Sequence, residues 1–273
     1  MNWDCHVHVF GSPDRYPLAS GRRYTPSVAD LAMLRRHLSA VDASQVVLVQ
    51  PTVYGDDHRC LIDALEALGE AAVAVGACPE AGAPPPTHPR IVALRLDLRG
   101  SWSGVSEQRL EHALAMSRQS ERHLELQIGP QALHPLAGLV AAARVPIVLD
   151  HLAGLSAQSG AESFEAFARL ASASNIFVKL SALERVPGGF EAALPVARRV
   201  AALAPDRLLW GSDWPHTPLH PPAEGRLQAL PFRQIDDAAT VEAIGAALGA
   251  QVMTKARRDT PDRVYRRLAP MSR

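Results

Sequence analysis

This sequence of 273 residues has no excess of basic over acidic residues, few cysteines and no long apolar run. Its 28 basic and 28 acidic residues balance to a formal net charge of zero, which argues against the positive field that attracts nucleic acids and anionic membranes. No apolar stretch approaches the ~20 residues of a membrane-spanning helix, and the N-terminal segment has no basic and apolar leader pattern. We therefore expect no nucleic-acid partner and no membrane partner.

The three cysteines, Cys5, Cys60 and Cys78, are odd in number and far apart, without a Cys-x-x-Cys pair. Such spacing is typical of a protein in a reducing compartment, so we expect a cytoplasmic location. Each cysteine is interpreted as a small buried apolar residue rather than as a nucleophile.

Short apolar segments alternate along the chain with segments of helical periodicity. Eight segments are predicted as strands: Trp3–Val9, Val46–Gln50, Ala72–Ala77, Ile91–Asp97, Leu124–Ile128, Pro146–Asp150, Ile176–Ser181 and Leu208–Asp213. Helices are predicted between most of them, as at Ser27–Leu38, Asp57–Leu68, Ser106–Gln119, Ser163–Ser172 and Glu191–Leu203. This alternation predicts an α/β fold, a (β/α)8 TIM barrel, with residues 1–273 forming one domain. The proline-rich segment Ala81–Arg90 is too short for a crossover helix, so one helix is expected to be missing.

Polar side chains gather at the carboxyl ends of the predicted strands, where the active sites of such barrels lie. His6 and His8 alternate with Cys5, Val7 and Val9, so the two histidines are expected on one face and the other three residues on the opposite face. Later strands carry Arg95, Asp97, Arg99, Glu125, Gln127, Asp150, His151, Lys179, Ser181 and Asp213. A structural ion pair accounts for any one of these, but their convergence on one mouth predicts an active site.

Several motifs, taken in order, resemble the amidohydrolase superfamily. They are Asp4-Cys5-His6-Val7-His8-Val9-Phe10-Gly11, Tyr24-Thr25-Pro26, Val49-Gln50-Pro51-Thr52-Val53-Tyr54-Gly55, Asp150-His151, Val178-Lys179-Leu180-Ser181 and Trp210-Gly211-Ser212-Asp213-Trp214-Pro215-His216. The segment from Thr260 to Tyr265 is similar to the family's Asn-Pro-x-x-Leu-Tyr signature, with Thr in place of Asn. The sequence is most similar to the branch of 2-pyrone-4,6-dicarboxylate lactonases, D-galactarolactone isomerases and sugar lactonases, which implies lactone chemistry.

The resemblance also bears on a metal. The usual superfamily ligands are matched by His6, His8, His151 and Asp213. However, Gln127 stands where metal-binding members have a histidine, and the cation of Arg95 is a poor neighbour for a divalent metal. A binuclear centre is therefore not expected, and similarity to the pyrone-dicarboxylate lactonases implies chemistry without a cofactor. The alternative is a single Zn²⁺ or other divalent metal held by His6, His8 and Asp213, with His151 near.

Each candidate residue has a role that its chemistry suits. Asp213 accepts protons when ionised and is predicted to activate water. The imidazoles of His6, His8 and His151 would polarise a lactone carbonyl and stabilise its oxyanion. Forked contacts to a substrate carboxylate are expected from Arg95, Arg99 and Arg185, although each is also a candidate for an ion pair within the barrel. Resemblance implies that Tyr24 and Thr52 hydrogen-bond the substrate. Lys179 is interpreted as a member of a barrel ion pair.

Two loops, Gly11–Ser27 and His216–Gln234, are longer than typical βα loops, and we expect them to cover the mouth and set substrate choice. The remaining histidines fall on predicted helices or loops and are expected at the surface: His58, His88, His112, His123, His134 and His220.

The function predicted is a hydrolase that opens a lactone of a carboxylated sugar acid or an aromatic-degradation intermediate. Three alternatives stay open: a lactone isomerase, a Zn-dependent decarboxylase of the same superfamily, and an inactive barrel that serves as a scaffold. The partner expected is a small carboxylated lactone, bound by a monomer or a homodimer.

Overall fold

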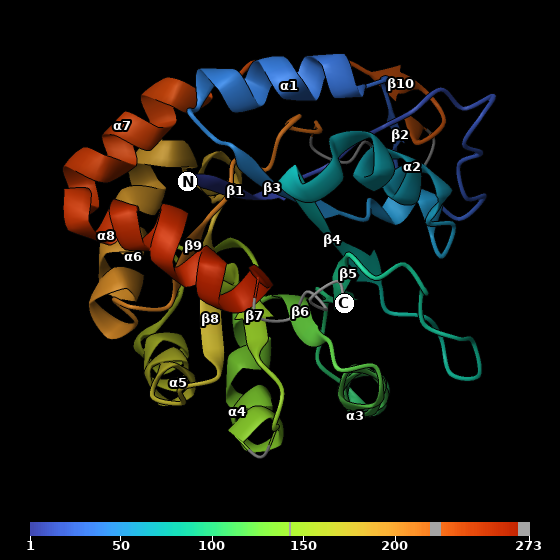
Figure 1. Cartoon of the computed structure of the whole chain (residues 1–273). Coiled ribbons are helices and arrows are strands. Elements are labelled where there is room, and N and C mark those ends of the chain that lie inside the picture. The colour runs from blue at the N-terminus through green and yellow to red at the C-terminus, as the bar shows by residue number, and fades with distance from the viewer. Residues whose placement is uncertain (142, 219–224, 267–273) are drawn as a thin grey trace.

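The computed structural model describes residues 1–141, 143–218 and 225–266. Its centre is one sheet of eight parallel strands (Figure 1). In spatial order they are β1 (Trp3–Val7), β3 (Gln45–Val49), β4 (Ala72–Ala77), β5 (Ile91–Leu98), β6 (His123–Ile128), β7 (Ile147–Leu149), β8 (Ile176–Leu180) and β9 (Leu208–Trp210). Each predicted strand is present, and the predicted barrel is confirmed.

The chain just beyond β9 closes the sheet against β1. The Asp213 N–H donates to the His6 carbonyl at 2.9 Å, and the His8 N–H donates to the Trp214 carbonyl at 2.8 Å. Gly211 permits this close approach, because a Cβ there would lie 2.6 Å from the His6 Cβ. Closure of the barrel therefore sets the Asp213 backbone beside both histidines.

A β-bulge in β1 changes which residues face the barrel interior. Three steps along β1, from Asp4 to Val7, correspond to two steps along β3. Cys5 packs with the apolar residues inside the barrel, whereas Val7 and Val9 pack on the helix-covered side. The expectation that Cys5 shares the face of Val7 and Val9 is therefore wrong, because the extra residue allows Cys5 and His6 both to lie inside.

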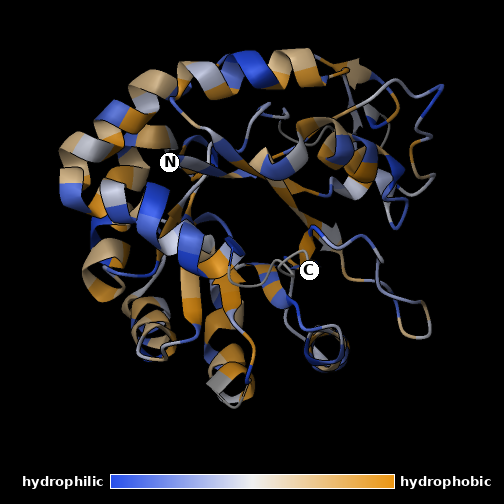
Figure 2. Cartoon of the chain, in the orientation of Figure 1, coloured by the Kyte–Doolittle hydropathy of each residue, from blue (hydrophilic) through white to orange (hydrophobic). Residues whose placement is uncertain are grey.

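Helices cover the outside of the barrel, as Figure 1 shows. They are α1 (Leu31–Ala40), α2 (Arg59–Leu68), α3 (Gly104–Gln119), α4 (Leu133–Ala141), α5 (Ala161–Ala171), α6 (Gly189–Leu203), α7 (Asp237–Leu248) and α8 (Ala250–Thr254). Residues 78–90, between β4 and β5, contain no helix, which confirms the expected gap. Figure 2 shows β7 and β8 largely hydrophobic, while the surrounding helices mix hydrophobic and hydrophilic residues. Across the described ranges, no helix is long and apolar enough to cross a membrane.

The amino end of the barrel is filled by the C-terminal part of the described chain. Tyr265 is fully buried, stacks on Trp3 and donates its hydroxyl to Glu125 at 2.9 Å. His123 lies edge-on to Tyr265 and is fully buried, so its expected surface position is wrong. His123 is the first residue of β6, and its side chain lies inside the barrel. The predicted strand began one residue later, at Leu124, so the sequence did not indicate this burial.

The two long loops are joined to each other at the opposite end. Two short strands, β2 (Thr25–Pro26) and β10 (Ala229–Leu230), pair in parallel. The hydroxyl of Thr25 also donates to the Arg226 carbonyl at 2.8 Å, and that of Ser27 donates to the Leu230 carbonyl at 3.0 Å. These bonds hold both loops beside the mouth. Residues 219–224 of the second loop, including His220, lie outside the described residues.

Candidate active site

A strongly polar pocket opens at the carboxyl ends of the strands and collects most of the residues predicted from the sequence. Its lining comprises His8, Tyr24, Pro51, Thr52, Arg95, Arg99, Gln127, His151, Arg185, Asp213 and Thr217. His6 is fully buried and contacts this lining through its ring, whose centroid lies 5.0 Å from that of His8 and 4.7 Å from that of His151. We call this cavity the reaction pocket. All nine predicted site residues are thus brought together.

Asp213 faces both histidines of the His-x-His motif. Its Oδ1 lies 3.7 Å from the His6 Nε2 and 3.5 Å from the His8 Nε2. Burial favours the neutral acid, but contact with His8 and the charges of neighbouring groups such as Arg185 outweigh burial and hold the pKa of Asp213 well below its usual range. The carboxylate is therefore ionised at neutral pH, as proton acceptance requires.

Arg185 is the charged partner of this carboxylate. Its Nε donates to Asp213 Oδ2 at 3.0 Å, and its terminal nitrogen donates to the hydroxyl and carbonyl of Thr217. Arg185 and Asp213 belong to different strand ends, 28 positions apart, so the sequence did not reveal this pair. A substrate anion that binds Arg185 would compete directly with Asp213 for the guanidinium.

The other two predicted arginines are also paired with carboxylates. Arg95 is buried and donates to Asp150 at 2.8 Å and to Gln127 at 2.7 Å. Arg99 lies nearer the solvent and contacts both oxygens of Asp97, at 3.0 Å through Nε and at 2.6 Å through its terminal nitrogen. Both therefore combine the two roles considered for them, since they form ion pairs and also line the pocket.

The two histidines of the His-x-His motif carry the ring hydrogen on different nitrogens. Lys179 lies 2.5 Å from Glu125 and 3.1 Å from His6 Nδ1, and the carboxylates around it keep its ammonium charged. An ammonium only donates, so His6 Nδ1 accepts and His6 Nε2 carries the hydrogen. His8 has the reverse arrangement, because its Nδ1 lies 2.8 Å from the Val49 carbonyl and must donate to it. Burial, reinforced by Lys179, lowers the pKa of His6 well below its ordinary value.

His151 completes the group of imidazoles. Its Nδ1 lies 2.8 Å from the Ser181 hydroxyl, and burial lowers its pKa. Several residues at these strand ends have left-handed backbone angles although none is glycine: His151 (φ 51°), Ala182 (φ 52°), Asp213 (φ 68°) and His216 (φ 64°). Such conformations are costly and cluster where function requires a fixed geometry.

A buried chain of acids and histidines behind Asp213 was not predicted from the sequence. Asp4 accepts from the Ser212 N–H at 2.9 Å and pairs with His37 at 2.9 Å. The other nitrogen of His37 lies 3.3 Å from Asp237, which also binds His216 at 2.9 Å. Carboxylate contacts overcome burial and raise the pKa of both histidines to about 9. We call Asp4, His37, Asp237 and His216 the supporting chain.

The supporting chain joins β1, α1, α7 and the segment after Asp213. Its members come from four distant stretches, and His37 and Asp237 lie on helices without any catalytic motif. Of its members, only Asp4 and His216 stand in the sequence motifs quoted above. Because it fixes Ser212 and His216, it holds Asp213 between two anchored neighbours.

Among the described residues, two groups place potential ligand atoms within 4.8 Å of one another: His6, His8 and Asp213, and His6, Asp150 and His151. His8 suits a metal, because its second nitrogen is fixed by a carbonyl. His6, which both groups need, does not suit one, because the Lys179 ammonium occupies Nδ1 and leaves the hydrogen on Nε2. The residues present therefore do not fit a metal held through His6.

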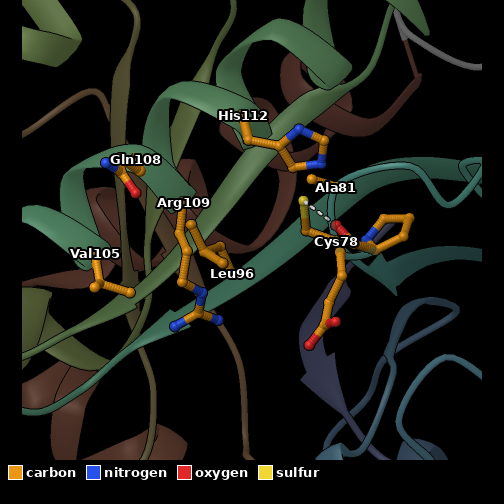
Figure 3. A pocket seen from close by; sticks show the side chains of 9 residues that line it. Cys78, Ala81, Leu96, Val105, Gln108, Arg109 and His112 are labelled. Carbon is orange, nitrogen blue, oxygen red and sulfur yellow. Dashed lines mark hydrogen bonds between the residues drawn. The ribbon is translucent and has the colours of Figure 1, made fainter.

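A second cavity lies beside α3, where the crossover helix is missing (Figure 3). Cys78, Leu96, Val105 and His112 are among its lining residues, and its surface is mainly apolar. Burial raises the pKa of the Cys78 thiol to about 11, so this thiol is protonated at neutral pH. This cavity therefore offers no ionised thiol.

The chain is similar to several known proteins over most of its length. A 4-sulfomuconolactone hydrolase of Rhizobium radiobacter is 29% identical over 259 residues, which cover 87% of this chain and 84% of the relative. A 2-pyrone-4,6-dicarboxylate hydrolase of Comamonas testosteroni is 29% identical over 249 residues, covering 82% and 80%. A solved structure from Pseudomonas putida, described as a candidate 2-pyrone-4,6-dicarboxylic acid hydrolase, is 26% identical, covers 99% of this chain and 98% of its own, and has a TM-score of 0.72. The amidohydrolase family model matches residues 3–267, and the protein therefore belongs to the amidohydrolase family.

Proposed function

We propose that this protein is a hydrolase that opens the ring of an anionic lactone, such as an intermediate of aromatic degradation. The observation that carries the proposal is the ionised Asp213 held against His6, His8 and Arg185 in one small polar pocket that His151 also lines. The curated relatives, which are named as hydrolases of carboxylated or sulfonated lactones, support the same substrate class.

In the proposed reaction, a water molecule attacks the lactone carbonyl carbon and passes a proton to Asp213. The Nε2 hydrogen of His6, fixed there by Lys179, donates to the developing oxyanion. His8 Nε2, whose partner nitrogen is committed to the Val49 carbonyl, lies 3.5 Å from Asp213 and can take that proton onward. Cleavage of the ring C–O bond releases an alkoxide or enolate oxygen, which receives the proton and leaves an open-chain acid.

Arg185 is proposed to recognise a carboxylate or sulfonate of the substrate. In the free protein this guanidinium is bound to Asp213, so arrival of a substrate anion draws it away from the base. Loss of that contact raises the pKa of Asp213 and makes it a stronger base at the moment when substrate is present. An anionic substituent would thus contribute to turnover as well as to affinity.

The proposed reaction proceeds without a metal cofactor, because the Lys179 ammonium commits His6 to a tautomer that donates rather than ligates. The two joined loops are proposed to set substrate choice, since Tyr24 and Thr217 bring them to the pocket wall. The free thiols Cys5, Cys60 and Cys78 fit the proposed cytoplasmic location. Whether the enzyme acts as a monomer or as a homodimer stays a prediction.

A panel of lactones tests the function. It should include pyrone dicarboxylate, muconolactones and aldarolactones, each assayed with and without a chelator. Mass spectrometry of the product distinguishes the reactions, because hydrolysis adds one water, isomerisation leaves the mass unchanged and decarboxylation removes carbon dioxide. We expect gain of water with the anionic lactones. Absence of turnover across the panel, or loss of carbon dioxide, would overturn the proposal.

A further inference from the structure

A third cavity adjoins the reaction pocket at its mouth, and we call it the outer chamber. Its lining includes Arg22, Arg23, Asp97, Arg109 and Ser106. It also includes Thr52 and Arg99, which are part of the reaction pocket as well. The two cavities therefore share part of their walls, so a ligand in the reaction pocket lies beside the outer chamber.

The outer chamber is strongly basic in a protein without net charge. Four arginines and one aspartate line it, which gives a net charge of three positive, whereas the whole chain sums to zero. The arginines come from three separate elements: Arg22 and Arg23 from the loop after β1, Arg99 from the end of β5, and Arg109 from α3. The tertiary fold therefore assembles this charge, since no single stretch of sequence contains it.

The outer chamber also differs from the reaction pocket in how its arginines are paired. Inside the reaction pocket, Arg95 and Arg185 each contact a carboxylate. Within residues 1–141, 143–218 and 225–266, no carboxylate lies within 4.0 Å of the guanidinium groups of Arg22, Arg23 or Arg109. Uncompensated guanidinium groups that converge on one cavity are suited to bind an anion.

Two of these arginines are held in place by neutral partners, which leave their charge available. Arg22 donates to the Thr25 hydroxyl at 3.0 Å and to the Ala19 carbonyl at 3.2 Å, within the loop that the β2–β10 pairing anchors. Arg109 donates to the Asp97 carbonyl at 3.3 Å, and Figure 3 shows its guanidinium directed away from His112. The chamber is thus partly organised before a ligand arrives.

We propose that the outer chamber is a second anion-binding subsite, which holds a carboxylate or sulfonate remote from the lactone carbonyl. This assignment rests on the proposed function for the identity of the ligand as substrate. In this arrangement the reacting ring and one anionic group occupy the reaction pocket, while the distant anionic group binds Arg22, Arg23 and Arg109. The preferred substrates are then lactones with two anionic groups.

A binding experiment tests the subsite without any turnover. Calorimetry on the full chain would compare three probes on one ring: benzoate, with one anionic group, and isophthalate and 3-sulfobenzoate, with two. We expect one or both dianions to bind at least about tenfold more tightly than benzoate. The double variant Arg23→Gln/Arg109→Gln should lose that difference while it keeps its affinity for benzoate. The larger of the two differences identifies the preferred group.

The matched control is Arg118→Gln/Arg169→Gln, which removes the same charge from exposed positions on α3 and α5. It should keep the full difference between dianions and benzoate. Equal binding of all probes by the parent protein, or an unchanged difference in the Arg23/Arg109 variant, would overturn the subsite. An equal loss of affinity for benzoate would instead indicate a general electrostatic attraction and would also overturn it.

Kinetics then separate this inference from the proposed function. With lactones that differ only in a distant carboxylate, the Arg23/Arg109 variant should raise KM for the dianionic lactone alone and leave kcat unchanged. If the binding difference is present but the parent chain opens no lactone, the proposed function fails while the anion subsite stands. If lactones are opened and both KM values are unaffected by the variant, the subsite fails while the function stands.

Discussion

The two ends of the barrel interior both bury charged side chains, but they arrange them differently. At the amino end, Glu125 contacts Lys179, Tyr265 and His123, so its carboxylate is enclosed by partners within the barrel. At the mouth, Asp213 and Arg185 also pair with each other, but both line a pocket. Buried charge alone therefore does not identify a reaction site. The distinguishing feature is polar atoms directed into an open cavity.

The largest expected effect on stability comes from removing Lys179, which pairs with Glu125 and also contacts His6 at the mouth. Replacement of Lys179 by Met leaves the charges of Glu125 and Asp150 buried without their ammonium partner. We expect the free energy of unfolding, measured by urea denaturation, to fall by roughly 3–5 kcal/mol. The double variant Glu125→Gln/Lys179→Met removes both charges and should regain part of the loss. If the Lys179→Met variant is as stable as the parent, the Glu125–Lys179 pair does not contribute to stability.

The next effect is a pH dependence of stability due to the supporting chain. The pKa values of His37 and His216 are raised to about 9 in the folded protein, above the ordinary value of 6.5. The stabilisation is therefore complete below pH 6.5 and is lost as the pH rises through about 9. We expect a decrease of roughly 2–3 kcal/mol in unfolding free energy across this window. Asp237→Asn should flatten the profile, and an equally steep profile in this variant would contradict the account.

A smaller effect separates the two roles proposed at the mouth, the base Asp213 and the anion-binding residue Arg185. Arg185→Met removes a cation 3.0 Å from Asp213, so the pKa of this carboxyl should rise. The acidic limb of kcat/KM for a neutral lactone such as dihydrocoumarin should then move up by about 1–2 pH units. Turnover of carboxylated lactones should fall in the same variant. An unmoved limb would show that Arg185 does not control the charge of Asp213.

The smallest expected effect is that of a chelator. Because Lys179 commits His6 to a donating tautomer, the purified protein should contain far less than one metal ion per chain. Its kcat should be the same before and after treatment with a chelator, measured together with elemental analysis. Stoichiometric zinc whose removal abolishes turnover would contradict the metal-free proposal.

Much of this architecture was predictable, because strand position determines where a side chain lies in a barrel. The alternation of apolar segments gave all eight strands, and the residues at their carboxyl ends gave many members of the reaction pocket, whereas Tyr24 and Thr52 came from the family resemblance. The missing helix followed from three consecutive prolines. These features depend on local periodicity and on one rule of topology, so a single sequence is sufficient to find them.

Features that depend on distances between remote segments were not predictable. The pairing of Arg185 with Asp213 requires two strand ends and a loop to be placed to within an ångström. The bulge that turns Cys5 inward has no local signature in β1, and burial of His123 depends on Tyr265 filling the barrel from the other end of the chain. The basic outer chamber likewise arises from three separate elements.

The central claim is that the mouth is a reaction centre and the amino end is structural, and a matched pair of neutral variants tests it most directly. Asp213→Asn and Glu125→Gln each remove one buried carboxylate charge. For each variant, kcat on an anionic lactone and the melting temperature should both be measured. The two variants should change these quantities in opposite ways. We expect Asp213→Asn to lose about 10³-fold in kcat without losing stability, and Glu125→Gln to lose stability but keep most of its kcat. Retained turnover in Asp213→Asn would contradict the account.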